Sequence, residues 1–225
     1  ESEKYGPSNY AIYMNKDYGN VKGYTFSLTK RYDPVSRTSA FVDYTYQVTE
    51  GNSVTSGSFY YNALSGEQEE KRIVPLAWDQ RHILNTNVSV GDPRNWNLGI
   101  ISKLSSGWPY TPNIPDANYV PQPNSGRKPW QWRVDMRLHK NFKIGKLNYL
   151  VFMKVYNLLD RRNERYVFND TGRAGYTYVF QSTQETQGFK SHYGEPGVHE
   201  WSEYQVRPHY YTAPRSVNVG FSVDF

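Results

Sequence analysis

The stretch QWRVDMRLHKNFKI, residues 131–144, alternates apolar and polar side chains with a period of two. Successive side chains of a β-strand point to opposite faces of the sheet, so this pattern predicts a strand with one apolar face and one polar face. The apolar set is Trp132, Val134, Met136, Leu138, Phe142 and Ile144, and the polar set is Arg133, Asp135, Arg137, His139, Asn141 and Lys143.

The same alternation recurs along the 225-residue chain and predicts about eight strands. The segment 147–158 is apolar on both sides, so its sequence does not say which side faces outward. The predicted strands are residues 8–15, 22–31, 38–50, 81–91, 96–106, 131–144, 147–158 and 214–225.

Short and long connections alternate between these strands. The short turns are YDPVSR, DPRN and GK, whereas residues 51–80, 107–130 and 159–213 form long connections. Compact soluble domains rarely carry structureless loops beyond about 15 residues. Transmembrane β-barrels have short turns on one side and long loops on the other. The spacing therefore favours an all-β fold, an antiparallel transmembrane β-barrel segment.

Aromatic residues, 16% of the chain, cluster near the predicted strand ends. Amphipathic rings favour the two membrane-water interfaces, so this placement is typical of a barrel wall. Scattered aromatic packing in a soluble β fold is the alternative. The aromatic residues near the long connections are Trp78, Trp108, Tyr110, Trp130 and Tyr156, and those near the short turns are Tyr32, Trp96, Phe142 and Phe225.

Composition argues against several other classes of protein. The chain has no cysteine, which excludes disulfides, thiolate metal sites and a cysteine nucleophile. The net charge of +5 comes from 26 basic and 21 acidic residues scattered without a basic stripe, so no nucleic-acid partner is expected. The five histidines match no metal motif. We therefore expect no metal, no cofactor and no enzymatic activity.

Six segments in the same order resemble the C-terminal part of the barrel of TonB-dependent outer-membrane receptors. The resemblance implies a bacterial outer-membrane location and TonB-driven uptake of a scarce nutrient of the siderophore, cobalamin, oligosaccharide or peptide class. It also implies contact with lipid and lipopolysaccharide, and a surface lipoprotein partner. The segments are PLAWDQRHILNTNVSV (75–90), SSGWPYTP (105–112), PWQWRVDMRLHKNFKIG (129–145), VYNLLDRRN (155–163), DTGRAGYTY (170–178) and YYTAPRSVNVGFSVDF (210–225).

Members of that family close about 22 strands around a plug. The resemblance therefore implies that residues 1–225 are roughly the last third of a barrel, with the plug and the TonB-contacting region outside this sequence. Asn218, Gly220, Val223 and Phe225 resemble the assembly signal of outer-membrane barrels, with Phe225 at the periplasmic interface. The alternative is a complete small outer-membrane barrel or adhesin, since eight strands can close a barrel. A membrane enzyme ranks third.

Two groups of residues are candidates for contact with a solute. In the connection 159–213, aromatic side chains can stack on a ring-shaped ligand, or the loop can be a lid packed on itself. Arg133, Asp135 and Arg137 suit a polar lumen wall that touches a plug or a charged solute, with ordinary hydration as the alternative. The candidate loop residues are Tyr176, Tyr178, Tyr193, Trp201 and Tyr204.

The same long connection carries two further expectations. Residues 164–168 and 176–181 alternate as strands do, which predicts that the sheet extends into the loop. Asp170, beside Thr171 and Gly172, offers one calcium ligand, although one carboxylate does not make a site.

Overall fold

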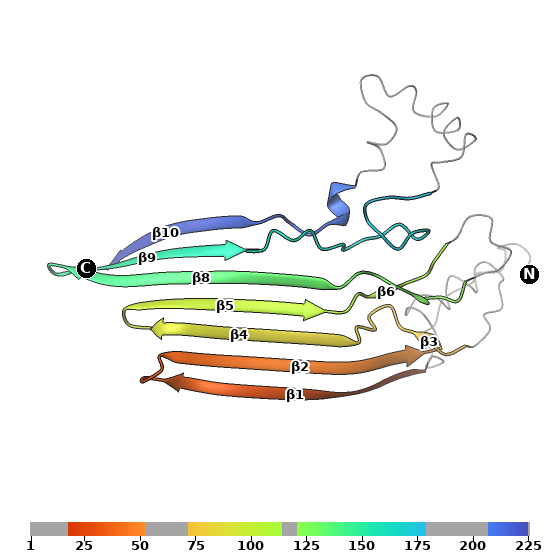
Figure 1. Ribbon diagram of the computed structural model, residues 1–225, viewed down its shortest axis with the longest axis horizontal. Helices are drawn as coiled ribbons and strands as arrows, with labels where there is room; N and C mark the ends of the chain where they lie inside the picture. The colour runs from red at the N-terminus through yellow and green to blue at the C-terminus, as the bar shows by residue number, and fades with distance from the viewer. Residues whose placement is uncertain (1–17, 53–71, 114–120, 179–206, 225) are drawn as a thin grey trace, which may run out of the picture.

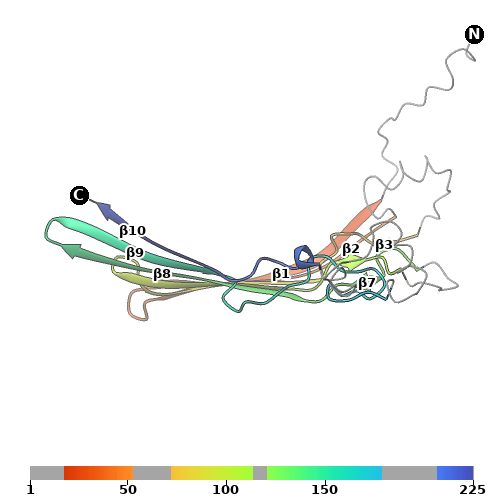
Figure 2. The same cartoon turned by 90° about the horizontal axis from the view of Figure 1, so that it is seen from above.

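A computed structural model of the chain describes residues 18–52, 72–113, 121–178 and 207–224. These residues form one layer of antiparallel strands, which Figures 1 and 2 show from two sides. Among the described residues, no helix is long and apolar enough to cross a membrane. The long strands are β1 (Gly19–Asp33), β2 (Thr38–Gly51), β4 (His82–Asp92), β5 (Trp96–Ser105), β8 (Gln131–Ile144), β9 (Leu147–Tyr156) and β10 (Ser216–Asp224).

The sheet has eight strands, so the prediction of an all-β antiparallel sheet is confirmed. Its long strands follow the order β1-β2-β4-β5-β8-β9-β10, and the short strand β3 (Val74–Pro75) pairs with the end of β2. The predicted strand 8–15 lies outside the described residues. A second, two-stranded sheet pairs β6 (Pro109–Tyr110) with β7 (Gly126–Arg127), and a 3-10 helix, η3, spans Pro208–Tyr210.

Strands β9 and β10 pair antiparallel although residues 157–215 separate them in the chain. This pairing runs from Ser216 opposite Tyr156 to Asp224 opposite Asn148. Strands β1 and β10 are the two edges of the sheet, and within the described residues no ladder joins them. The described sheet is therefore an open arc.

Three short turns lie at one end of the sheet (Figure 1, left). In the β1–β2 turn, the carboxylate of Asp33 accepts hydrogen bonds from the backbone N–H groups of Val35 and Ser36 at 3.1 and 3.0 Å. The β8–β9 turn contains Gly145 at φ +62°, a left-handed conformation that glycine adopts without strain. The described parts of the longer connections begin and end at the opposite end of the sheet, which we call the loop end.

The register of the ladders places apolar side chains of all seven long strands on one face. Directly paired residues point to the same side of a sheet. One line of such pairs runs through Val88, Ile100, Met136, Val155 and Val217, from β4 to β10. We call this side the apolar face. The register also resolves 147–158, because it puts Leu147, Tyr149, Val151, Met153 and Val155 on this face.

The opposite side, which we call the polar face, carries a matching line of polar residues. Ser27, Asp43, Asn85, Lys103 and Arg133 are paired in turn from β1 to β8. Two consecutive residues of a strand therefore face two different environments.

The described residues enclose little apolar core. Large side chains on the apolar face stay open, since Phe26 is 63% and Phe221 77% exposed. An apolar surface of this size marks a contact with another apolar phase or partner. The buried apolar residues of the described chain are Val74, Val134, Val155, Val167 and Ala174.

Candidate functional site

Arg133, Asp135 and Arg137 share the polar face of β8 but have different partners. The Arg133 Nε donates to Asp135 Oδ1 at 2.9 Å, and the backbone N–H of Asn157 donates to the same oxygen at 2.9 Å. The Asp135 carboxylate is thus engaged. Within the described part of the chain, the Arg137 side chain has no hydrogen-bond or ion-pair partner.

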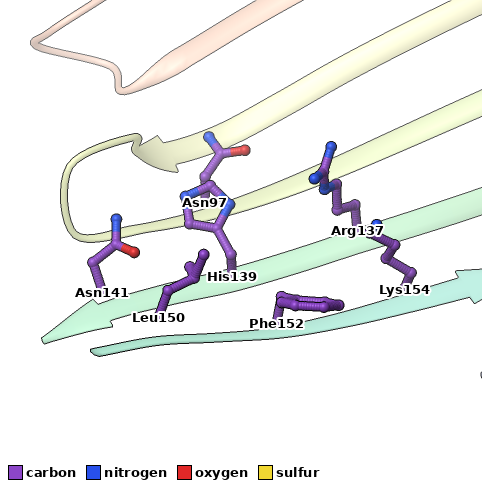
Figure 3. A pocket seen from close by; sticks show the side chains of 7 residues that line it. All are labelled: Asn97, Arg137, His139, Asn141, Leu150, Phe152 and Lys154. Atoms are coloured by element: carbon purple, nitrogen blue, oxygen red, sulfur yellow. The ribbon is translucent and has the colours of Figure 1, made fainter. Parts of the chain in front are cut away.

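A hollow of about 470 Å³ lies on the polar face beside Arg137, over β5, β8 and β9 (Figure 3). Arg137 is directly paired with Lys154 on β9, and His139 is paired with Asn97 on one side and Phe152 on the other. None of the residues that line the hollow is acidic. They are Asn97, Arg137, His139, Asn141, Leu150, Phe152 and Lys154.

Two glycines on the polar face shape this hollow. A Cβ at Gly99, the β5 residue paired with Arg137, would meet only a backbone oxygen at 3.9 Å, so the space beside Arg137 is open. A Cβ at Gly220 would lie 2.5 Å from Cζ of Phe152. The Phe152 ring therefore lies directly over Gly220, and the Lys154 ammonium lies 5.1 Å from the centre of that ring.

The described residues of the predicted assembly signal lie on both faces of β10. Asn218 and Gly220 are on the polar face, paired with Lys154 and Phe152, and Val223 is on the apolar face, paired with Tyr149. Phe225 lies outside the described residues. The assembly role of these four residues stays a prediction.

Of the predicted ligand-loop residues, the structure describes only Tyr176 and Tyr178. Their rings contact each other edge to face at 5.7 Å, and both side chains are exposed. Tyr193, Trp201 and Tyr204 lie outside the described residues. The ligand role of this loop is therefore a prediction.

The prediction of strands at 164–168 and 176–181 is wrong within the described residues. Glu164 forms only an isolated bridge to Tyr211, and no described residue of 176–178 is in a strand. Carboxylates take the backbone donors that a ladder would need. Glu164 Oε2 accepts from the Ala174 N–H and Asp170 Oδ2 from the Tyr178 N–H, both at 2.5 Å.

These contacts also bear on the idea of a calcium ligand at Asp170. Its Oδ2 accepts from the Thr177 hydroxyl at 2.8 Å as well as from the Tyr178 backbone. Across the described ranges, no three His, Asp or Glu side chains are grouped closely enough to hold a metal ion. Asp170 thus organises the loop backbone.

Three groups at the loop end have shifted pKa values. The hydrogen bond from Arg173 to the Glu164 carboxylate raises the pKa of that guanidinium. Burial lowers the pKa of Lys128. The pKa of Tyr110 is raised, first by burial and then by the negative charge of Asp170.

Sequence reasoning missed Asp79, which ties the loop end to the sheet. Its side chain is fully buried, and its Oδ1 accepts from the backbone N–H of Thr49 on β2 at 2.8 Å. Its Oδ2 accepts from Arg81 at 3.3 Å and from Arg127 on β7. Arg127 also donates to the Asp79 carbonyl oxygen. One carboxylate therefore joins segments far apart in sequence.

Two buried asparagines, also missed, hold the chain where β9 ends. Asn157 adopts φ 52° and its Nδ2 donates to the Ala213 carbonyl oxygen at 3.0 Å. The Asn163 amide accepts from the Trp132 N–H and donates to the Trp132 carbonyl oxygen, both at 2.9 Å. Asn163 thus replaces the missing strand neighbour of Trp132. In the sequence, these residues are asparagines in a polar connecting segment, and that pattern alone does not indicate which backbone groups they bind.

Aromatic groups lie at both ends of the apolar face. At the loop end, His82 contacts Tyr46 at 5.1 Å and stacks on Trp130 at 5.6 Å. At the opposite end, where the short turns lie, the rings of Phe142 and Tyr149 stack with their centres 5.3 Å apart. The apolar face is therefore bounded by aromatic rings at both ends.

Tyr156 is the last residue of β9 and lies at the loop end, where the sequence placed it, but its side chain is on the polar face. It is paired with Ser216, and the guanidinium of Arg133 lies 5.9 Å from the centre of its ring. The residue is one position past the apolar Val155, so strand alternation turns it to the other side.

Comparison with protein-family models, curated proteins and solved structures finds no match to this chain.

Proposed function

We propose that this chain is part of the wall of an outer-membrane nutrient receptor, with its apolar face on lipid and its polar face on an aqueous lumen. The observation that carries the proposal is the register, which gathers apolar side chains from seven long strands on one face. Lipid-spanning β walls need this arrangement, because lipid-facing and lumen-facing residues alternate along each strand.

The height of the apolar face supports the same proposal. Trp132 and Phe142 lie on this face near the two ends of β8, ten residues apart. At about 3.3 Å per residue they are separated by roughly 33 Å along the strand, which a tilt of about 40° reduces to about 25 Å. The apolar band of an outer-membrane barrel has about this height.

The receptor proposal also accounts for the open edges of the sheet, the lumen and the loop end. The two open edges of the described sheet, β1 and β10, pair with barrel strands that lie outside the described residues, because unpaired backbone groups are costly in lipid. A plug fills the lumen, TonB supplies energy through a region outside this sequence, and lipopolysaccharide surrounds the loop end. A surface lipoprotein is a further partner. The solute is a scarce nutrient of the siderophore, cobalamin, oligosaccharide or peptide class.

Cysteine labelling tests the orientation of the wall. The neighbours Ile100 and Ile101 are identical residues on opposite faces, and this chain has no cysteine of its own. In the full-length protein in native membranes, a charged maleimide is expected to label Ile101→Cys and to leave Ile100→Cys unlabelled until detergent is added. Labelling of both from water would contradict the lipid-facing assignment.

An uptake assay tests the receptor function itself. Cells lacking the gene should lose TonB-dependent growth on one limiting source of iron, cobalamin, sugar or peptide, and the intact gene should restore it. Unchanged growth on every source, together with lost attachment to a surface, would favour the adhesin instead. A native chain close to the 26.2 kDa of this sequence would favour a complete small barrel.

A further inference from the structure

The hollow on the polar face contains an uncompensated pair of cations. Arg137 and Lys154 are directly opposite each other on β8 and β9. Like charges in this position destabilise a sheet. Neither side chain has a carboxylate partner within the described residues, and the hollow that they line has no acidic residue. Figure 3 shows the two side chains projecting from the same face.

A second pair of cations on the same face has a carboxylate as its counter-ion. Lys103 and Arg133 are also directly opposite each other, on β5 and β8. There the Arg133 guanidinium is bound to Asp135 at 2.9 Å. The two pairs differ in that the described residues supply a counter-ion to the Lys103–Arg133 pair and none to the Arg137–Lys154 pair.

The surroundings of the uncompensated pair fit an oxyanion. A guanidinium offers a planar fork of donors and an ammonium a point charge, a combination suited to the oxygens of carboxylate or phosphate. Asn97 adds a side-chain amide whose oxygen accepts from the Ser89 hydroxyl at 2.9 Å and whose nitrogen can donate to an anion. The open space at Gly99 lets a group approach Arg137. The Lys154 ammonium is also positioned over the Phe152 ring.

We propose that this hollow binds the carboxylate or phosphate group of a small anionic solute, with Arg137 and Lys154 as its charged donors. Resting on the receptor function proposed above, this makes the transported nutrient an anionic one that contacts the wall on the turn side of β8. The anion supplies the negative charge that the described residues do not provide at this position.

Binding of simple anions tests the site. Citrate and inorganic phosphate are titrated into the purified full-length protein in detergent, at an ionic strength held constant with chloride, by calorimetry. We expect saturable binding of at least one of them, weakened about tenfold by Arg137→Gln and by Lys154→Gln, because each loses a charge-assisted hydrogen bond. Lys103→Gln, the matched control on the same face, should change the Kd less than about twofold.

Thermal unfolding in anion-free buffer gives an independent readout. Arg137→Gln relieves the cationic repulsion and should leave the unfolding temperature unchanged or higher, whereas a purely structural arginine would lower it on removal. The proposal is overturned if wild type binds neither anion, or if Lys103→Gln weakens binding equally. A lower unfolding temperature for Arg137→Gln also overturns it, since an acidic segment of the protein itself would then occupy the hollow.

These outcomes are separate from the receptor function. Anion binding to purified protein needs neither TonB nor transport, so its failure leaves the uptake proposal standing. Conversely, intact anion binding in a protein whose loss affects no uptake would refute the receptor and keep the site.

Discussion

The two faces of the sheet share one backbone and one register, yet they are built for different surroundings. The line of pairs through Val88, Ile100 and Met136 is apolar, and the line one residue away, through Asn87, Ile101 and Asp135, mixes polar and apolar groups. In a sheet one layer thick, the environment of a residue is set by whether its position in the strand is odd or even. Two consecutive residues of a strand should therefore differ sharply in how much stability a charged substitution costs.

An arginine on the apolar face is the strongest way to test this contrast. Val88 is near the middle of β4 and is paired with Ala40 and Ile100. The proposed lipid-facing wall predicts that Val88→Arg lowers the free energy of unfolding by about 2–4 kcal/mol, because a charge near the bilayer midplane would lose its hydration. Urea titration of the full-length protein in lipid bilayers, followed by tryptophan fluorescence, measures this loss.

The adjacent residue provides the matched control. Asn87 is exposed on the polar face and is paired with Phe41 and Ile101. Asn87→Arg introduces the same side chain one position away and should change the free energy of unfolding by less than about 0.5 kcal/mol, as surface substitutions usually do. Equal losses at Val88 and Asn87 would mean that the two faces do not differ in environment.

A second contrast separates the loop end from the strands. Asp79 is fully buried with three donors around its carboxylate, whereas Asp43, in the middle of β2, accepts one side-chain hydrogen bond from Ser27 at 2.6 Å. We expect Asp79→Ala to cost about 2–3 kcal/mol, since it leaves the Thr49 N–H without its acceptor and removes the carboxylate that binds Arg81 and Arg127. Asp43→Ala should cost about 0.5–1 kcal/mol.

Chemical denaturation of both aspartate variants, alongside limited proteolysis, measures this second contrast. Proteolysis of Asp79→Ala should begin at the loop end while the strands stay protected, because Asp79 holds segments that the ladders do not. If the Asp43 variant loses as much stability as the Asp79 variant, the loop end is no more dependent on side-chain bonds than the strands are.

Alternation predicted the long strands because every second side chain faces the same surroundings. It missed β3, β6 and β7, since a strand of two residues has no period to detect. It also wrongly extended the sheet into 164–168 and 176–181, where Glu164 and Asp170 bind backbone N–H groups instead. The alternation of apolar and polar residues predicts a strand correctly where backbone hydrogen bonds between strands determine the structure. It predicts wrongly where side-chain hydrogen bonds to the backbone determine it.

The candidate site was predicted only in part, for a related reason. The sequence places Arg133, Asp135 and Arg137 on one face of a strand, and the register agrees. It does not reveal that Lys154 lies opposite Arg137, because that depends on the pairing between β8 and β9. The contacts of Asp79 with Thr49 and Arg127, and that of Asn163 with Trp132, likewise join residues 30 or more positions apart. Contacts at such separations leave no periodic trace in a single sequence.

The smallest expected effect compares two glycines of the polar face. Gly220→Ala puts a methyl group 2.5 Å from Cζ of Phe152 and should cost about 1 kcal/mol, because the ring must move. Gly99→Ala meets only the Arg137 carbonyl oxygen at 3.9 Å and should be neutral or slightly stabilising, since alanine restricts the unfolded chain. Urea midpoints of both variants measure the difference.

A double-mutant cycle assigns the Gly220 effect to the ring. With Phe152→Leu in place, the group above Gly220 is smaller and more adaptable, so adding Gly220→Ala should cost less than half of what it costs in the wild type. Adding Gly99→Ala to Phe152→Leu should remain additive, because Gly99 is paired with Ser89 and Arg137 and not with Phe152. An unchanged cost of Gly220→Ala in the Phe152→Leu background would show that backbone strain in β10, and not the ring over Gly220, requires glycine at this position.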